Sequence, residues 1–140
     1  MGLKEWLALL EREGLSLLIL KGGKTVFQSS EHGIRPLLEA VAHLAPALTL
    51  EGSTVIDKVV GKAGALLICY FRGKQVYAKT MSRSAAELLK RNGVDFEAEE
   101  VVEAIGGGCP FERAVSEIDD PEEAFVRLSG LTRSVAGRAS

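Results

Sequence analysis

"DKVVGKAGALLICY", residues 57–70, decides the fold of this chain. Three charged side chains, Asp57, Lys58 and Lys62, stand in front of one of the most apolar runs in the sequence. A charged group at the edge of a buried segment needs either a partner or a route to water. The stretch therefore raises two questions, which element it forms and what its charged residues do there.

Two secondary structures are compatible with this stretch. Residue propensities favour three strands within residues 53–80, TVIDKVV, ALLICYF and QVYAKTM, with a GKAG turn between the first two. Alternatively, residues 57–70 form one helix that is apolar nearly all round and therefore buried on both sides. Gly61 and Gly64 would each cost this helix about 1 kcal/mol relative to alanine, unless close packing offsets the loss. Periodicity alone does not decide between the two.

The remaining segments have clearer patterns. Apolar spacing, glycine turns and capping residues predict helices and strands in alternation, which indicates an α/β fold. Residues 131–140 carry little apolar content, and we expect them to form a disordered tail. The predicted elements are a helix over 2–13, a hairpin of strands 15–20 and 25–29, a helix over 33–44, a strand over 75–80, a helix opened by a Ser84–Glu87 capping box, a strand over 94–102, a short helix from Pro110 and a last helix between Asp120 and Gly130.

The composition is that of an ordinary globular domain. The chain has 140 residues, of which 46% are hydrophobic and 26% charged, so one domain with a real core is expected. The formal charge of −2 argues against a nucleic-acid partner, which requires a clustered excess of Lys and Arg. The charged N-terminal stretch does not resemble a signal peptide, and the apolar runs are too short for a membrane span. We expect a cytoplasmic protein with no membrane contact.

Three stretches carry a resemblance to a known family. They are VIDKVVGKAGALL (55–67), VYAKTMSRSAAELLKRNGV (76–94) and GGCPFE with DDPEEAF (107–125). Together with the order of elements, they resemble an uncharacterised bacterial family, domain-of-unknown-function family eighteen ninety-three, over residues 15–128. The architecture of that family is similar to the cytidine-deaminase fold. The resemblance implies a single three-layer α/β/α domain over residues 1–130, with a mixed sheet, helices on both faces, and residues 57–70 as the central helix.

The resemblance does not extend to the zinc chemistry of the deaminases. Such an enzyme needs a His or Cys and two further Cys on the metal, and a Glu that carries protons. The matching positions here are Asp57 and Lys58 in the first motif and Ser82 and Ala85 in the second, and Cys109 on a later loop cannot replace the missing ligands. We therefore expect no metal, no other cofactor and no zinc-dependent deaminase activity.

The first candidate site is the start of the expected helix. On a helix, Lys58 and Lys62 would share one face, and Asp57 could cap the first turn. A helix N-terminus with two lysines favours an anionic ligand group. The alternative is that both lysines extend along their methylene stems into water. Ser82 caps the following helix, and the resemblance also places it beside the former metal pocket, where its hydroxyl could bind a ligand.

The second candidate site is the GGGCPFE stretch. Gly107 and Gly108 allow the backbone to approach a ligand closely. Cys109 stands at the start of a helix, where the partial positive charge lowers a thiol pKa and favours the nucleophilic thiolate. Glu112 could contribute to a ligand site or only cap the backbone. The alternative is a flexible turn with an unreactive cysteine, and His32 either faces the same cleft or lies in water.

These residues support three hypotheses about function. The main one is a domain that binds a small anionic or nucleotide-like ligand through both candidate sites. The second is a metal-free enzyme in which Cys109 is a nucleophile or sulfur carrier and Lys62 stabilises negative charge. The third is a structural or interaction protein with a vestigial cleft, which predicts a homo-oligomer or a partner complex.

Overall fold

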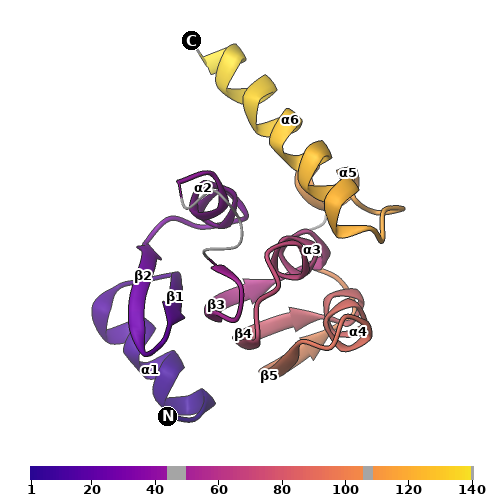
Figure 1. Ribbon diagram of the computed structural model, residues 1–140. Coiled ribbons are helices and arrows are strands. Elements are labelled where there is room, and N and C mark those ends of the chain that lie inside the picture. The colour runs from indigo at the N-terminus through magenta and orange to yellow at the C-terminus, as the bar shows by residue number, and fades with distance from the viewer. Residues whose placement is uncertain (44–49, 106–108, 140) are drawn as a thin grey trace.

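The computed structural model describes residues 1–43, 50–105 and 109–139 (Figure 1). Within these residues, five strands form one mixed sheet in the order β2-β1-β3-β4-β5. β1 pairs antiparallel with both β2 and β3, whereas β3, β4 and β5 run parallel to one another. The strands are β1 (Leu17–Lys21), β2 (Lys24–Ser29), β3 (Thr54–Val60), β4 (Gln75–Ser82) and β5 (Asp95–Val102).

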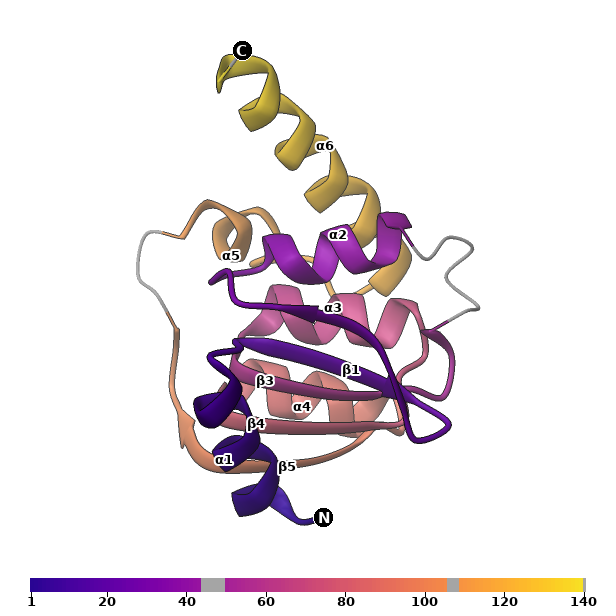
Figure 2. The ribbon, with the colours of Figure 1, turned by 90° about the vertical axis from the view of Figure 1, so that its left-hand side faces the viewer.

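Helices cover both faces of this sheet, as Figure 2 shows, with α1 in front and α3 and α4 behind. The expected α/β fold with a mixed sheet and helices on both faces is therefore confirmed. α2, α5 and α6 pack against α3 on the side away from α1. The helices are α1 (Leu3–Glu13), α2 (Arg35–His43), α3 (Lys62–Tyr70), α4 (Arg83–Arg91), α5 (Pro110–Ala114) and α6 (Pro121–Ala139).

The stretch 57–70 is neither one helix nor two strands. It is the end of β3 followed by α3, with Gly61 as the N-cap residue of the helix. The expectation of a helix from Asp57 is wrong for its first four residues, because TVIDKVV is rich in β-branched side chains that favour a strand. The expectation is confirmed for the apolar run from Lys62 to Tyr70.

Burial explains why this stretch is so apolar. Val55 and Ile56 of β3 are both fully buried, Val55 in the core under α3 and Ile56 in a smaller cluster under α1. A strand that is covered on both faces has a continuous run of apolar residues, whereas a strand covered on one face alternates apolar and polar residues. α3 is buried from Ala63 to Cys69 because the sheet, α2, α4 and α6 all pack against it.

Two details of the later helices differ from expectation. The N-cap of α4 is Ser82, whose hydroxyl accepts a hydrogen bond from the backbone of Ala85, so the capping box expected at Ser84 does not form. The last helix does not end at Gly130 but continues to Ala139. The disorder expected along residues 131–140 stays a prediction. In the part of the chain that is described, no helix has the length and apolar character needed to cross a membrane.

Candidate functional site

A cavity of about 160 Å³ lies at the carboxyl end of β3. The pairing of β1 with β3 ends at Leu17 and Asp57, followed by one hydrogen bond of 3.1 Å from the Lys58 nitrogen to the Ser16 carbonyl oxygen. Beyond it, Val59 pairs with β4 and lines the cavity. The cavity is lined from four parts of the chain: Ser16, the 32–34 segment, β3 with the start of α3, and the segment around α5. In sheets with parallel strands, ligands typically bind beyond the carboxyl ends of the strands, at the point where the strand order reverses.

Asp57 lines the cavity with a carboxyl group whose pKa is raised. Burial raises the pKa of its carboxyl to about 7, against the opposing effect of hydrogen bonds from the backbone of Val59 and Lys58. The bond from the Val59 nitrogen to Oδ1 measures 3.3 Å. Near neutral pH this carboxyl is therefore present in both protonation states, so it can donate as well as accept a hydrogen bond.

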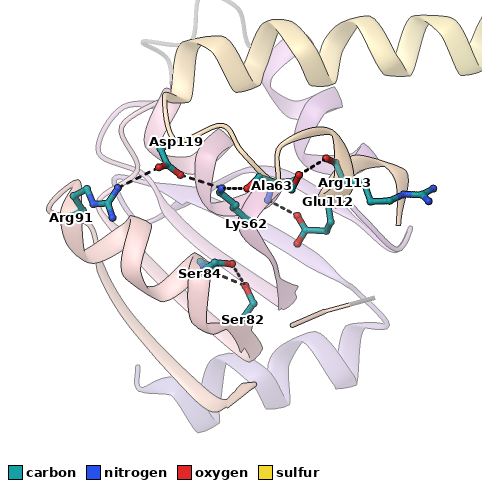
Figure 3. Close-up of polar contacts among 10 residues, drawn as sticks. Lys62, Ala63, Ser82, Ser84, Arg91, Glu112, Arg113 and Asp119 are labelled. Atoms are coloured by element: carbon teal, nitrogen blue, oxygen red, sulfur yellow. Dashed lines mark hydrogen bonds and ion pairs between the residues drawn. The ribbon is translucent and has the colours of Figure 1, made fainter. Parts of the chain in front are cut away.

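Glu112 brings a second carboxylate to the cavity, from α5 to the start of α3 (Figure 3). Its Oε2 accepts a hydrogen bond of 2.8 Å from the backbone nitrogen of Ala63. The N-terminus of a helix carries unsatisfied N–H groups and partial positive charge, so a carboxylate is stabilised there. Glu112 thus fills, from within the chain, the place expected for an anionic ligand group.

Lys62 points toward the segment that follows α5 (Figure 3). Its Nζ donates to the carbonyl oxygen of Ser116 at 2.9 Å and forms an ion pair with Asp119 Oδ1 at 3.1 Å. The Lys62 side chain is 15% exposed, and it does not line the cavity. Because Lys58 lies on β3 and Lys62 on α3, the two lysines do not share a helix face, and Asp57 does not cap the helix.

Ser82 has a structural role as the N-cap residue of α4. Its side chain is 2% exposed, and its hydroxyl lies 3.2 Å from both the Ala85 nitrogen and the Ser84 hydroxyl. It does not line the cavity at the end of β3. Gly107 and Gly108, expected to approach a ligand, lie outside the described residues.

Cys109 and His32 line the cavity from two loops. Cys109 is half-buried and is the N-cap residue of α5, with its side chain making no capping hydrogen bond. The loop with His32 is held near the cavity by Ser16, whose hydroxyl donates to the carbonyl oxygens of Ser29 and Glu31. The sequence offered no signal for Ser16, because its position depends on where β1 begins beside β3.

The described residues do not form the ligand set that a metal ion requires. Among the described residues, no group of three or more His, Cys, Asp or Glu side chains is placed to hold a metal ion. The start of α3 carries Lys62 and Ala63, and the start of α4 carries Ser82 and Ala85, none of which is a usual zinc ligand. Of the residues singled out in the sequence, the structure brings together around one cavity His32, Asp57, Lys58, Cys109 and Glu112.

Comparisons with known proteins agree on one family. A family model described as TM1506, a domain of unknown function (DUF1893), matches residues 6–131. The crystal structure of a DUF1893 family protein (TM1506) from Thermotoga maritima is similar with a TM-score of 0.78 and 35% sequence identity, covering 91% of this chain and 88% of that chain. No curated protein matches. With a family match over nearly its whole length and this structural relative, the chain belongs to the DUF1893 family.

Proposed function

We propose that this protein binds a small nucleotide-like ligand whose ring enters the cavity at the end of β3. The observation that carries the proposal is the convergence of Asp57, His32, Cys109 and Glu112, from separate parts of the chain, on one hollow. Ligand sites in proteins are typically apolar hollows with a few convergent polar groups, at least one of them with a perturbed pKa. Ile34 and Phe111 supply apolar wall here, and Asp57 supplies the perturbed group.

The size of the cavity limits what it can hold. Its volume of about 160 Å³ is comparable to that of a cavity that holds a single benzene-sized ring. A heterocyclic base fits this scale, whereas the sugar and phosphates of a nucleotide must lie outside. The carboxyl of Asp57 can donate and accept, which suits the paired N–H and C=O or N groups on the edge of such a ring.

The proposed fold is a zinc-free form of the cytidine-deaminase architecture. Its support is the strand order β2-β1-β3-β4-β5 and the two parallel units β3–α3 and β4–α4, which correspond to the elements that carry the metal motifs in the deaminases. The absence of zinc-ligating residue types at the start of both helices supports a binding role rather than metal-dependent deamination.

Isothermal titration with a panel of free nucleobases, nucleosides and nucleotides tests the proposal. At least one ring is expected to bind the parent protein, and Asp57→Asn is expected to weaken it about tenfold by removing a charged or donating carboxyl. Asp95→Asn, a matched change at an exposed position on β5, should leave the affinity unchanged. Absence of binding by every ring, or equal loss in both variants, would overturn the proposal.

A second candidate function follows from the presence of Cys109 and His32 in the same cavity as Asp57. In this case the Cys109 sulfur adds to the carbon of a C=O or C=N group of the ligand, the π bond of that group breaks with its electron pair going to the heteroatom, and the thiol proton ends on that heteroatom. Intact-mass measurement separates the two functions. A covalent adduct that Cys109→Ser abolishes supports the enzyme, whereas ligand binding that survives Cys109→Ser without an adduct supports the binding domain. An oligomer or complex indifferent to these changes would instead support the interaction protein.

A further inference from the structure

Ser16 lies directly before β1 and lines the same cavity as Asp57. It is 5% exposed, so its hydroxyl is shielded from water. A buried hydroxyl costs free energy unless it is hydrogen-bonded, and the partners of this one therefore indicate what it does.

Hydrogen bonds join Ser16 to two walls of the cavity. On the β3 side, its carbonyl oxygen accepts a bond of 3.1 Å from the Lys58 nitrogen. On the β2 side, its nitrogen donates to the Ser29 carbonyl oxygen at 2.9 Å. Its hydroxyl donates to the same oxygen at 3.1 Å and to the carbonyl oxygen of Glu31. Because His32 follows Glu31 in the chain, one residue connects β3 with the segment that carries the imidazole.

The hydroxyl is what ties the His32 segment to the rest of the fold. β2 ends at Ser29 and α2 begins at Arg35, so the chain between them has no strand or helix to hold it. Within the described part of the chain, the Ser16 hydroxyl is the one group outside residues 29–34 that is hydrogen-bonded to residues 30–33. Loss of this hydroxyl would therefore release His32 from its place in the cavity wall.

We infer that Ser16 is a positioning residue of the ligand site and that it acts through His32. The inference rests on the proposed function, because the ligand is the ring that enters the cavity. A cavity of about 160 Å³ holds a single ring, so side chains of different walls contact the same ligand. Asp57 supplies the polar group of one wall, and His32 supplies an imidazole that donates or accepts a second hydrogen bond.

The NMR signals of the His32 imidazole test this hold on the segment without a ligand. The chain has two histidines, so His32→Gln assigns the signals. Ser16→Ala is expected to move them toward their positions in the unfolded chain, with the fold intact by circular dichroism. Ser30→Ala, the same change at an exposed position of the same segment, should leave them in place. Unchanged His32 signals in Ser16→Ala would overturn the inference.

Titration with a ring that binds the parent protein tests the effect on the ligand. Ser16→Ala should weaken binding roughly fivefold, the effect of losing one hydrogen bond, whereas Ser30→Ala should not weaken it. In a His32→Gln background, Ser16→Ala should cause no further loss, because the contact that it positions is already gone. Equal loss with and without His32 would show that Ser16 acts on the fold in general, and the inference would fail.

The two measurements also separate this inference from the proposed function. If no ring binds the parent protein, the proposed function fails, and a shift of the His32 signals in Ser16→Ala leaves Ser16 with a role in the loop alone. If a ring binds and Asp57→Asn weakens it, but neither Ser16→Ala nor His32→Gln does, the proposed function stands and the inference is wrong.

Discussion

Glu112 Oε1 lies where a side chain at position 61 would have to begin: a Cβ added to Gly61 would come within 1.7 Å of it. The other oxygen of the same carboxylate accepts the backbone hydrogen bond from Ala63. Gly61 is therefore glycine because of this close approach, since its own φ of −98° is open to any residue. The two residues join α5 to the start of α3, beside the cavity.

Gly61→Ala is the first prediction. The new methyl group must displace the Glu112 carboxylate, which is the end of a flexible side chain, so the variant loses the hydrogen bond that caps the start of α3. We expect it to lower the free energy of unfolding by about 1 kcal/mol, as measured by urea denaturation. In a Glu112→Ala background the same change should cost much less, because nothing is left to displace.

Gly130→Ala is the matched control for this change. A Cβ at Gly130, within α6, meets nothing within 4 Å, so alanine should stabilise the helix by up to about 1 kcal/mol. Equal destabilisation by Gly61→Ala in the parent and in the Glu112→Ala background would show that Glu112 is not the cause.

The fold was largely predictable from local patterns, and the main difference is the boundary between β3 and α3. The β1–β2 hairpin, α4 and the alternation of helices with strands followed from periodicity and turn residues. The boundary between β3 and α3 did not, because a strand buried on both faces and a buried helix look alike in sequence. The decisive residue there, Gly61, has its role through Glu112, a contact between distant parts of the chain that no local pattern contains.

Part of the cavity lining was predictable from the sequence, but Lys62 and Ser82 do not line the cavity and the arrangement was not predictable. Asp57, Cys109 and Glu112 were singled out because charged and nucleophilic groups beside apolar runs and glycines are unusual, and they do line one cavity. The anion-binding role expected for Lys62 assumed a helix that begins at Asp57. With α3 beginning at Lys62 itself, its ammonium group faces Ser116 and Asp119 instead.

Lys62→Met is the second prediction. The change keeps most of the buried stem but removes the donor to the Ser116 carbonyl and the ion pair of Lys62 with Asp119, which keeps its longer ion pair with Arg91. The Asp119 side chain is 64% exposed, so the ion pair itself adds little, and we expect a loss of about 1 kcal/mol in the free energy of unfolding. Arg91→Met, which removes a more exposed partner of Asp119 at 4.0 Å, should change stability by less than about 0.5 kcal/mol.

The same variant also tests the role of Lys62 in binding. Because Lys62 does not line the cavity, Lys62→Met should keep the affinity for any ring that the parent protein binds. A loss of that affinity, with the fold intact by circular dichroism, would support the ligand role expected from the sequence.

The third prediction concerns Asp57 and pH. Burial raises the pKa of this carboxyl from its ordinary value of 3.8 to about 7, so the folded protein keeps a proton that the unfolded chain releases. This group's contribution to stability therefore falls as pH rises between these two values, and the full loss, present above the folded pKa, is at most about 4 kcal/mol. Asp57→Asn should remove this part of the pH dependence and be more stable than the parent above pH 7.

Urea denaturation of parent and variant at acidic and at mildly alkaline pH measures the difference. Asp95→Asn, at an exposed site, should follow the parent at both values. If Asp57→Asn has the same pH dependence as the parent protein, the carboxyl is not held protonated in the folded state.

The fourth prediction compares the two cysteines. Cys109 is half-buried in the cavity wall, whereas burial beside α4 raises the pKa of the Cys69 thiol to about 11. Since the thiolate is the species that reacts, iodoacetamide at neutral pH should label one site in the folded protein and both in denaturant. Cys109→Ser should abolish labelling of the folded protein, and Cys69→Ala should leave it unchanged.

A ligand in the cavity should slow this labelling, because Cys109 lines the cavity wall. The rate also separates the two candidate functions, since a catalytic nucleophile should react faster than free cysteine and a residue of a binding site should not. Labelling of Cys69 in the folded protein would show that α3 and α4 separate readily. Labelling of Cys109 that no cavity ligand slows would place its thiol outside the site.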